Sequence, residues 1–264
     1  MSRLNLSALL VFAGIASSLL VGSSNQAVAQ TVVFDTNLGD IQVELSSDAE
    51  RRGTVANFLA YVNAPAGSNY DGTFIHRSIS GFVVQGGGFY TPINGLVASV
   101  PQMLPIVNEP GISNTRGTIA MAKIDGDPDS ATNQWFFNTV DNSDNLDIQN
   151  GGFTVFGTVT SGMNVVDAIE AAPILDIDGD DSTLFNAVPI VIINNNTADF
   201  VVVNSVRVVV PGDVNLDGAI DFLDIAPFIS VLSTSDFQAE ADINLDTNVD
   251  FLDISLFIGL LSSQ

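Results

Sequence analysis

Residues 70–89 read YDGTFIHRSISGFVVQGGGF and decide the fold of most of the chain. Two short runs in this stretch, 73–75 and 82–85, are rich in aromatic and β-branched residues and are divided by a turn of serine and glycine. Similar short runs recur at 118–122, 135–138 and 154–156. Because many short strands separated by Gly, Pro and Asp turns are typical of closed sheets, the pattern predicts a mainly β fold built as a barrel.

The segments around these strands predict a hairpin and two helices. Alternating apolar residues over 31–45 indicate two paired strands joined by a tight turn. Apolar residues at helical spacing follow Thr54, a residue type that caps helices, and stop before Pro65. The same spacing predicts a second helix over 163–171.

Two further runs of Val and Ile, 188–193 and 200–210, are expected to close the barrel. An acidic loop precedes them. It contains Asp176, Asp178 and Asp180, which could bind calcium, but no second half of a calcium loop follows in register. A solvated turn is therefore the favoured interpretation.

The chain composition excludes several classes of function. The 264 residues include 30 acidic and 7 basic side chains, for a formal net charge of −23, so nucleic acid and anionic lipid would repel the protein. The sequence contains no cysteine, which excludes disulfides and thiolate chemistry. A content of 46% hydrophobic residues is enough for one or two packed domains.

Residues 1–29 have the features of a secretory signal peptide. Arg3 precedes an apolar run at 8–21, and Ala27 and Ala29 form a small-residue cleavage site. A retained membrane anchor is less favoured because the run is short and interrupted by glycine and serine. We therefore expect an exported protein, located in the periplasm, on the cell surface or outside the cell, with no membrane span after signal removal.

Five blocks of sequence carry a resemblance to one family. Residues 70–89, 108–109, 114–122, 130–138 and 153–163, in this order and spacing, resemble the cyclophilin family of prolyl cis/trans isomerases. With the flanking strands, the resemblance covers about residues 31–210. It implies a closed eight-stranded antiparallel barrel capped by two helices. It also implies isomerase activity toward X-Pro bonds of Pro-containing polypeptides, with no cofactor.

The chemistry of such a site can be argued from the residues. Amide resonance gives rotation about an X-Pro bond a barrier of about 18–20 kcal/mol, and no nucleophile is needed to lower it. A fixed guanidinium near the prolyl amide would stabilise the twisted, non-conjugated state. Arg77 is the candidate, and the resemblance adds Gln85 and Phe136 to the catalytic set. A surface salt bridge is the less favoured alternative for Arg77 because the chain has so few arginines.

The resemblance also implies a substrate groove. The residues assigned to it are Phe82, Val83, Ala122, Lys123, Gln134, Asn145, Leu146 and Phe153. Three of them depart from the family's pattern: Asn145 stands where Trp or Phe is common, Phe153 where His or Tyr is common, and Lys123 where Asn is common. His76 is expected on the opposite side of its strand from Arg77, as a structural residue, and Trp135 is expected in the core.

The C-terminal part of the chain repeats itself at an offset of 29 residues. Each copy places oxygen-bearing residues at positions 1, 3, 5, 7, 9 and 12 of a loop, the spacing of a calcium-binding loop. The first set is Asp213, Asn215, Asp217, Ala219 (through its carbonyl), Asp221 and Asp224; the second is Asp242, Asn244, Asp246, Asn248 (through its carbonyl), Asp250 and Asp253. Thr247 replaces the turn glycine Gly218 in the second copy.

Each loop is closed by Asp rather than Glu and leads directly into one apolar helix, expected over 222–232 and 251–261. This arrangement resembles a dockerin-type pair of repeats and implies two Ca²⁺ sites and a protein docking partner. We therefore expect an isomerase domain over 30–210 and a docking module over 211–264. An acidic linker that binds nothing is the alternative.

Three functional hypotheses follow. The first is an active exported foldase whose tail docks it on a partner. The second is a module that binds Pro-containing segments without turnover. The third is a calcium-dependent surface scaffold in which isomerase activity is dispensable.

Overall fold

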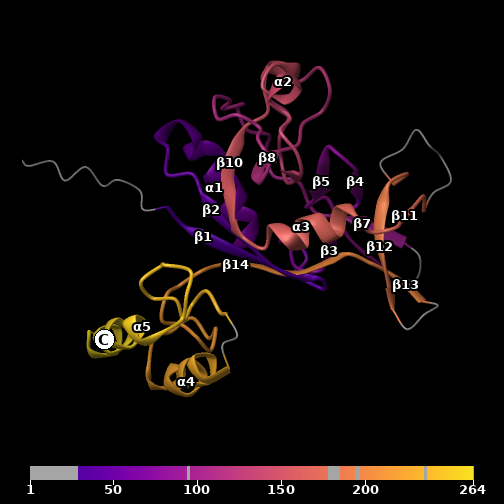
Figure 1. Cartoon of the computed structure of the whole chain (residues 1–264). Coiled ribbons are helices and arrows are strands. Elements are labelled where there is room, and N and C mark those ends of the chain that lie inside the picture. Colours follow the sequence, from indigo (N-terminus) through magenta and orange to yellow (C-terminus); the bar gives the residue numbers. More distant parts are fainter. Residues whose placement is uncertain (1–28, 94–95, 178–184, 194–196, 235–236, 264) are drawn as a thin grey trace, which may run out of the picture.

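In the computed structural model, one large antiparallel sheet forms the body of the molecule (Figure 1). The structure describes residues 29–93, 96–177, 185–193, 197–234 and 237–263. The eleven strands of the sheet follow the order β4-β5-β9-β8-β10-β2-β1-β14-β3-β6-β7. Their bounds are β1 (Thr31–Thr36), β2 (Gly39–Leu45), β3 (Thr73–Phe74), β4 (Arg77–Ile79), β5 (Val83–Gly86), β6 (Phe89–Ile93), β7 (Leu96–Ser99), β8 (Thr118–Met121), β9 (Trp135–Asn138), β10 (Val155–Ser161) and β14 (Val202–Val208).

This sheet confirms a mainly β fold but corrects its details. It has eleven strands rather than eight, because several short connections also pair as strands. Its end strands β4 and β7 are not paired with each other in the described part of the chain, so closure of the barrel stays a prediction.

The prediction that residues 188–193 close the barrel was wrong. This segment forms β12 (Val188–Ile193), which pairs with β11 (Ile174–Leu175) and β13 (Thr197–Phe200) in a separate three-stranded sheet. The physical reason is that both edges of β12 are taken within this small sheet, by β11 and β13. The small sheet lies beside the end strand β4, where the amide of Ser78 donates to the carbonyl of Ala187 over 2.8 Å. Only the second Val-rich run joins the main sheet, as β14.

Two helices pack on the sheet and cover its aromatic core. They are α1 (Arg52–Val62) and α3 (Met163–Glu170). Phe34, Phe58 and Trp135 are fully buried between them and the strands, and the ring centroids of Phe34 and Trp135 lie 4.9 Å apart, edge to face. Trp135 is therefore a core residue, as predicted.

The start of α1 differs from the sequence-based expectation. The helix begins at Arg52, after a short 3₁₀ turn, η1 (Ala49–Arg51), rather than at a Thr54 cap. The carboxylate of Glu109 accepts hydrogen bonds from the backbone amides of Gly53 and Thr54, at 3.2 and 2.8 Å. Thr54 also donates its hydroxyl to Glu109 over 2.7 Å. A distant carboxylate thus performs the capping, which local sequence does not reveal.

The C-terminal segment forms a small helical unit with its own core. After the turn η3 (Phe222–Asp224) come α4 (Ile225–Thr234) and α5 (Phe251–Ser262). The rings of Phe228 and Phe257 stack between these helices with centroids 4.3 Å apart.

This helical unit contacts the main sheet beside β14. Arg207 on β14 pairs with Glu240 of the tail over 3.0 Å, and the Glu240 side chain is only 1% exposed. Val33 of β1 and Val209, which directly follows β14, form a small apolar cluster with Ala239 of the tail. The tail is therefore packed against the sheet rather than hanging from it.

Parts of the sequence-based predictions lie outside the described residues. They are the signal peptide, apart from Ala29, and the acidic positions Asp178 and Asp180. Asp176 is described and exposed. Among the described residues, no helix combines the length and the apolarity that crossing a membrane requires.

Candidate functional site

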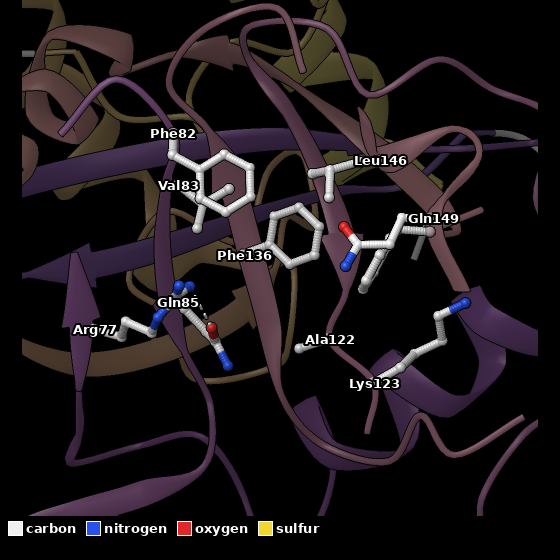
Figure 2. A pocket seen from close by; sticks show the side chains of 10 residues that line it. Arg77, Phe82, Val83, Gln85, Ala122, Lys123, Phe136, Leu146 and Gln149 are labelled. Carbon is white, nitrogen blue, oxygen red and sulfur yellow. Dashed lines mark hydrogen bonds between the residues drawn. The ribbon is translucent and has the colours of Figure 1, made fainter. Parts of the chain in front are cut away.

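A cavity of about 300 Å³ opens over the β4-β5-β9-β8 end of the sheet (Figure 2). Its walls come from these strands and from a loop segment that contains α2 (Ser143–Leu146) and the turn η2 (Gln149–Gly151). The lining residues are Arg77, Phe82, Val83, Gln85, Ala122, Lys123, Phe136, Leu146, Gln149 and Phe153. This set brings together nine of the eleven residues that the sequence assigned to catalysis and substrate contact.

The floor of the cavity is apolar. Phe136 projects from β9, is 4% exposed, and packs edge to face against Phe153 with ring centroids 5.7 Å apart. Val83 and Leu146 belong to the same apolar cluster, which is separate from the main core of the sheet. An apolar surface of this kind, open on one side, suits a flat pyrrolidine ring or another small apolar group.

A single guanidinium stands beside this floor. Arg77 on β4 lies directly opposite Gln85 on β5 in the strand register, and its Nη1 donates a hydrogen bond to Gln85 Oε1 over 3.3 Å. Gln85 in turn donates from Nε2 to Gln134 Oε1 over 2.8 Å. Burial lowers the pKa of Arg77 from its ordinary value, yet arginine keeps its charge at neutral pH. In the described part of the chain no carboxylate pairs with Arg77, which leaves its cationic field directed at the cavity.

Two predicted residues lie apart from this cavity. Gln134 lines a neighbouring cavity of about 470 Å³ that shares Gln85, Ala122 and Lys123 with the first. Asn145 is exposed on α2 and lines neither cavity, whereas its neighbour Leu146 is buried and does.

Gln149 is the lining residue that sequence reasoning missed. Figure 2 shows its side-chain amide directed toward Phe136. Nothing in the sequence distinguishes this glutamine, because it is a polar residue in a loop with no periodic pattern.

Lys123 contributes an ammonium group at the far end of the cavity. Its Nζ donates to the backbone carbonyls of Asn150 and Gly152, at 2.9 and 2.6 Å, and lies 4.7 Å from the ring centroid of Phe153. Burial lowers the pKa of Lys123, and Asp129 partly opposes this shift.

His76 is not part of the cavity lining. Its ring is fully buried and meets Phe89 edge to face, with ring centroids 5.0 Å apart. Burial lowers its pKa to about 4, Gln134 opposes this shift, and Arg77 adds to it. The side chain of Gln134 is near enough to the His76 ring to affect its pKa. Neither ring nitrogen, however, has a hydrogen-bond partner among the described residues. A neutral, buried ring is a structural histidine, as the sequence led us to expect.

The two C-terminal loops repeat each other in structure as well as in sequence. Asp213 accepts the amides of Asp217 and Gly218, at 3.1 and 3.0 Å, and Asp242 accepts those of Asp246 and Thr247, at 3.1 and 2.8 Å. The atoms that the loops offer as metal ligands are oxygens, which a hard cation such as Ca²⁺ prefers.

The closing carboxylates of these loops are buried. Asp224 and Asp253 are 0% exposed, and in the described residues neither has a basic partner. Backbone amides donate to both oxygens of each carboxylate. A cation would supply the counter-charge that these buried groups lack, so the residues are compatible with one. Among the described residues, however, no three His, Cys, Asp or Glu side chains are grouped closely enough to hold a metal ion. Calcium binding therefore stays a prediction.

The ten lining residues of the main cavity include no serine, threonine, cysteine or carboxylate. The fold and the cavity together are thus a curled antiparallel sheet that carries one arginine beside an apolar floor. Residues 31–195 match the family model described as cyclophilin type peptidyl-prolyl cis-trans isomerase/CLD. The chain belongs to this family, and with it to the peptidyl-prolyl isomerases.

Comparisons with individual proteins agree. The chain is 42% identical over 154 residues to a peptidyl-prolyl cis-trans isomerase of Acinetobacter baylyi, covering 57% of this chain and 77% of the relative. It is 47% identical over 146 residues to one of Streptomyces antibioticus, covering 53% and 82%. A crystal structure of a cyclophilin type isomerase of Cryptosporidium parvum superposes with a TM-score of 0.50 at 22% identity, covering 69% of this chain and 98% of that chain, and shows likeness of fold alone.

The tail matches a second family. Residues 211–262 match the model of the dockerin type I domain, which confirms the resemblance found in the two loops.

Proposed function

We propose that the chain accelerates cis/trans exchange of X-Pro bonds in exported polypeptides, using Arg77 to stabilise the twisted amide. The observation that carries this proposal is the placement of one guanidinium at the edge of an apolar cavity floored by Phe136. The proline ring would lie on Phe136 and Phe153, which fixes the position of its amide nitrogen relative to Arg77. We assign this activity to residues 30–210.

The energetic requirement is modest. Twisting the amide breaks its resonance, so the nitrogen becomes pyramidal and gains a lone pair, and a cationic donor holds this form more strongly than the planar one. Stabilising the twisted state by about 4 kcal/mol corresponds to roughly a thousandfold acceleration. Gln85 would keep the guanidinium oriented toward the amide, because it accepts a hydrogen bond from Arg77 on the neighbouring strand.

The test is exchange spectroscopy on an X-Pro peptide with the wild type, Arg77→Ala and Arg77→Lys. We expect the rate constant of the bound peptide to fall roughly a hundredfold or more in Arg77→Ala, as when one oxyanion donor is removed elsewhere. Arg77→Lys should recover little, because an ammonium lacks the planar fork. A wild type that binds the peptide without accelerating exchange would favour the alternative of a non-catalytic Pro-binding module.

The tail, residues 211–264, extends the proposal. Its match to the dockerin type I model supports a role in docking the isomerase on a partner protein outside the cytoplasm, with two Ca²⁺ ions held by the repeated loops. Calorimetric titration of the full chain with CaCl₂ should reveal two sites, and Asp224→Asn together with Asp253→Asn should abolish both. A chain that binds calcium and its partner but has no isomerase activity would instead be a surface scaffold.

A further inference from the structure

Lys123 is the only lysine in the chain, and its ammonium group forms hydrogen bonds to one loop. The carbonyls of Asn150 and Gly152 receive its hydrogen bonds, and the ring of Phe153 lies under its charge at 4.7 Å. The two acceptor carbonyls and the ring belong to the stretch that forms one wall of the cavity. The contacts therefore connect the end of β8 to that wall.

This stretch of wall needs external support. Asn150, Gly151 and Gly152 have φ angles of 51°, 76° and 80°, three consecutive residues in the left-handed region. Within the turn the amide of Gly152 donates to the carbonyl of Gln149 over 2.9 Å, and the positive φ of Asn150, which is not a glycine, costs conformational energy. The residues on either side, Gln149 and Phe153, both line the cavity.

Neutral contacts hold the same turn as well. Asn108 donates its amide to the carbonyls of Gly151 and Gly152, at 3.0 and 2.9 Å, and Asn150 donates its side-chain amide to the carbonyl of Ile124 over 2.9 Å. Lys123 is the one charged donor in this set, and charge-assisted hydrogen bonds are about twice as strong as neutral ones.

We propose that Lys123 is a positioning residue, whose ammonium group fixes the wall formed by Gln149 and Phe153 and so sets how tightly a proline ring is held. It would act through the loop rather than on the reacting amide. The part of this inference that concerns the bound peptide rests on the proposed function.

The variants are Lys123→Met, which keeps the aliphatic stem, and Lys123→Arg, which keeps a cationic donor. Because Arg77, Gln85 and Phe136 are held by strands, we expect Lys123→Met to raise KM about tenfold while kcat stays within about twofold. Lys123→Arg should recover most of the lost affinity. Arg52→Gln removes the same charge from an exposed position on α1 and should change neither constant.

A second readout does not depend on activity. Amide hydrogen exchange of Asn150, Gly151 and Gly152 should accelerate about tenfold in Lys123→Met and not in Arg52→Gln. In addition, ¹⁵N-lysine labelling of the wild type gives an ammonium signal that belongs unambiguously to Lys123, and its visibility near neutral pH reports that the group is held by hydrogen bonds.

Three results would overturn the inference: a Lys123→Met variant with wild-type KM and amide exchange, a loss of kcat without a rise in KM, or a Lys123→Arg variant no better than Lys123→Met. If the wild type does not isomerise the peptide at all, the proposed function fails. The amide exchange of the loop still decides whether Lys123 fixes the wall.

Discussion

Arg77 and Gln85 are cross-strand partners on β4 and β5, and the guanidinium of the first donates to the side-chain oxygen of the second over 3.3 Å. Because both residues lie on paired strands, the sheet determines how the guanidinium is oriented. Gln85 is itself held by its hydrogen bond to Gln134 over 2.8 Å. A series of side-chain hydrogen bonds therefore connects the cavity of Arg77 to the neighbouring cavity.

The first prediction concerns the hydrogen bond between Arg77 and Gln85. Gln85→Ala should lower the rate constant of the bound peptide roughly tenfold, less than Arg77→Ala, because the guanidinium loses its orientation but not its charge. If Gln85 acts through Arg77, the double variant should be no slower than Arg77→Ala alone. Exchange spectroscopy of all four proteins measures this, and simple additivity of the two losses would contradict it.

The second prediction separates the observed site from the one read from sequence. Gln149 lines the cavity and Asn145 does not, although both are exposed polar residues of the same loop segment. Gln149→Ala should raise KM about threefold, which corresponds to less than about 1 kcal/mol, and Asn145→Ala should leave it unchanged. Peptide titration of both variants is the measurement. The reverse ranking would show that the loop adopts another path in solution.

The third prediction follows from the buried histidine. The pKa of His76 is about 4 in the folded chain, against 6.5 for an unperturbed imidazole. As pH falls through 6.5, the unfolded chain takes up this proton and the folded chain does not, so stability decreases until pH reaches about 4 and then has no further contribution from this group.

This difference in pKa is worth about 3 kcal/mol. Between pH 7 and pH 4 the free energy of unfolding of the wild type should therefore drop about 3 kcal/mol more than that of His76→Gln. Urea titrations at a series of pH values give both curves. Parallel curves for the two proteins would mean that His76 is not buried in neutral form.

The fourth prediction uses the internal repeat as its own control. Thr247 has a φ of 71° at the position where the first loop has Gly218, whose φ is 88°. A β-branched residue in the left-handed region is strained, so Thr247→Gly should stabilise the tail by about 1 kcal/mol and strengthen the calcium binding predicted for the second loop.

Gly218→Thr should impose the same penalty on the first loop. An added Cβ there meets nothing within 4 Å, so the cost would be conformational rather than steric. Calcium titration and thermal unfolding of the full chain test the pair. A destabilised Thr247→Gly would show that the threonine side chain compensates its strain.

The sequence predicted the strands and helices with strong periodicity, including both helices of the sheet and both helices of the tail. It also identified most of the cavity, because Arg77, Phe82 and Gln85 lie within one recognisable block. It missed what depends on contacts between distant segments. The Glu109 carboxylate at the start of α1 is 55 residues from Thr54 in the chain, and Gln149 enters the cavity through a turn without periodic pattern.

The sequence also did not predict correctly how all of the strands pair with each other. Residues 188–193 have the composition of a barrel strand, but the partners of a strand depend on which other segments lie next to it. Both edges of β12 pair with the short strands β11 and β13, and local sequence does not encode this choice.

The ion pair between Arg207 and the buried Glu240 joins the tail to β14. In Figure 1 the helices of the tail and the strands that carry the cavity lie on opposite sides of β14. A scaffold that captured the tail would therefore leave the cavity of Arg77 facing away from it. Molecules immobilised through their tails would still bind polypeptides from solution. Enzymes attached to a support by the face away from their substrate site behave in the same way.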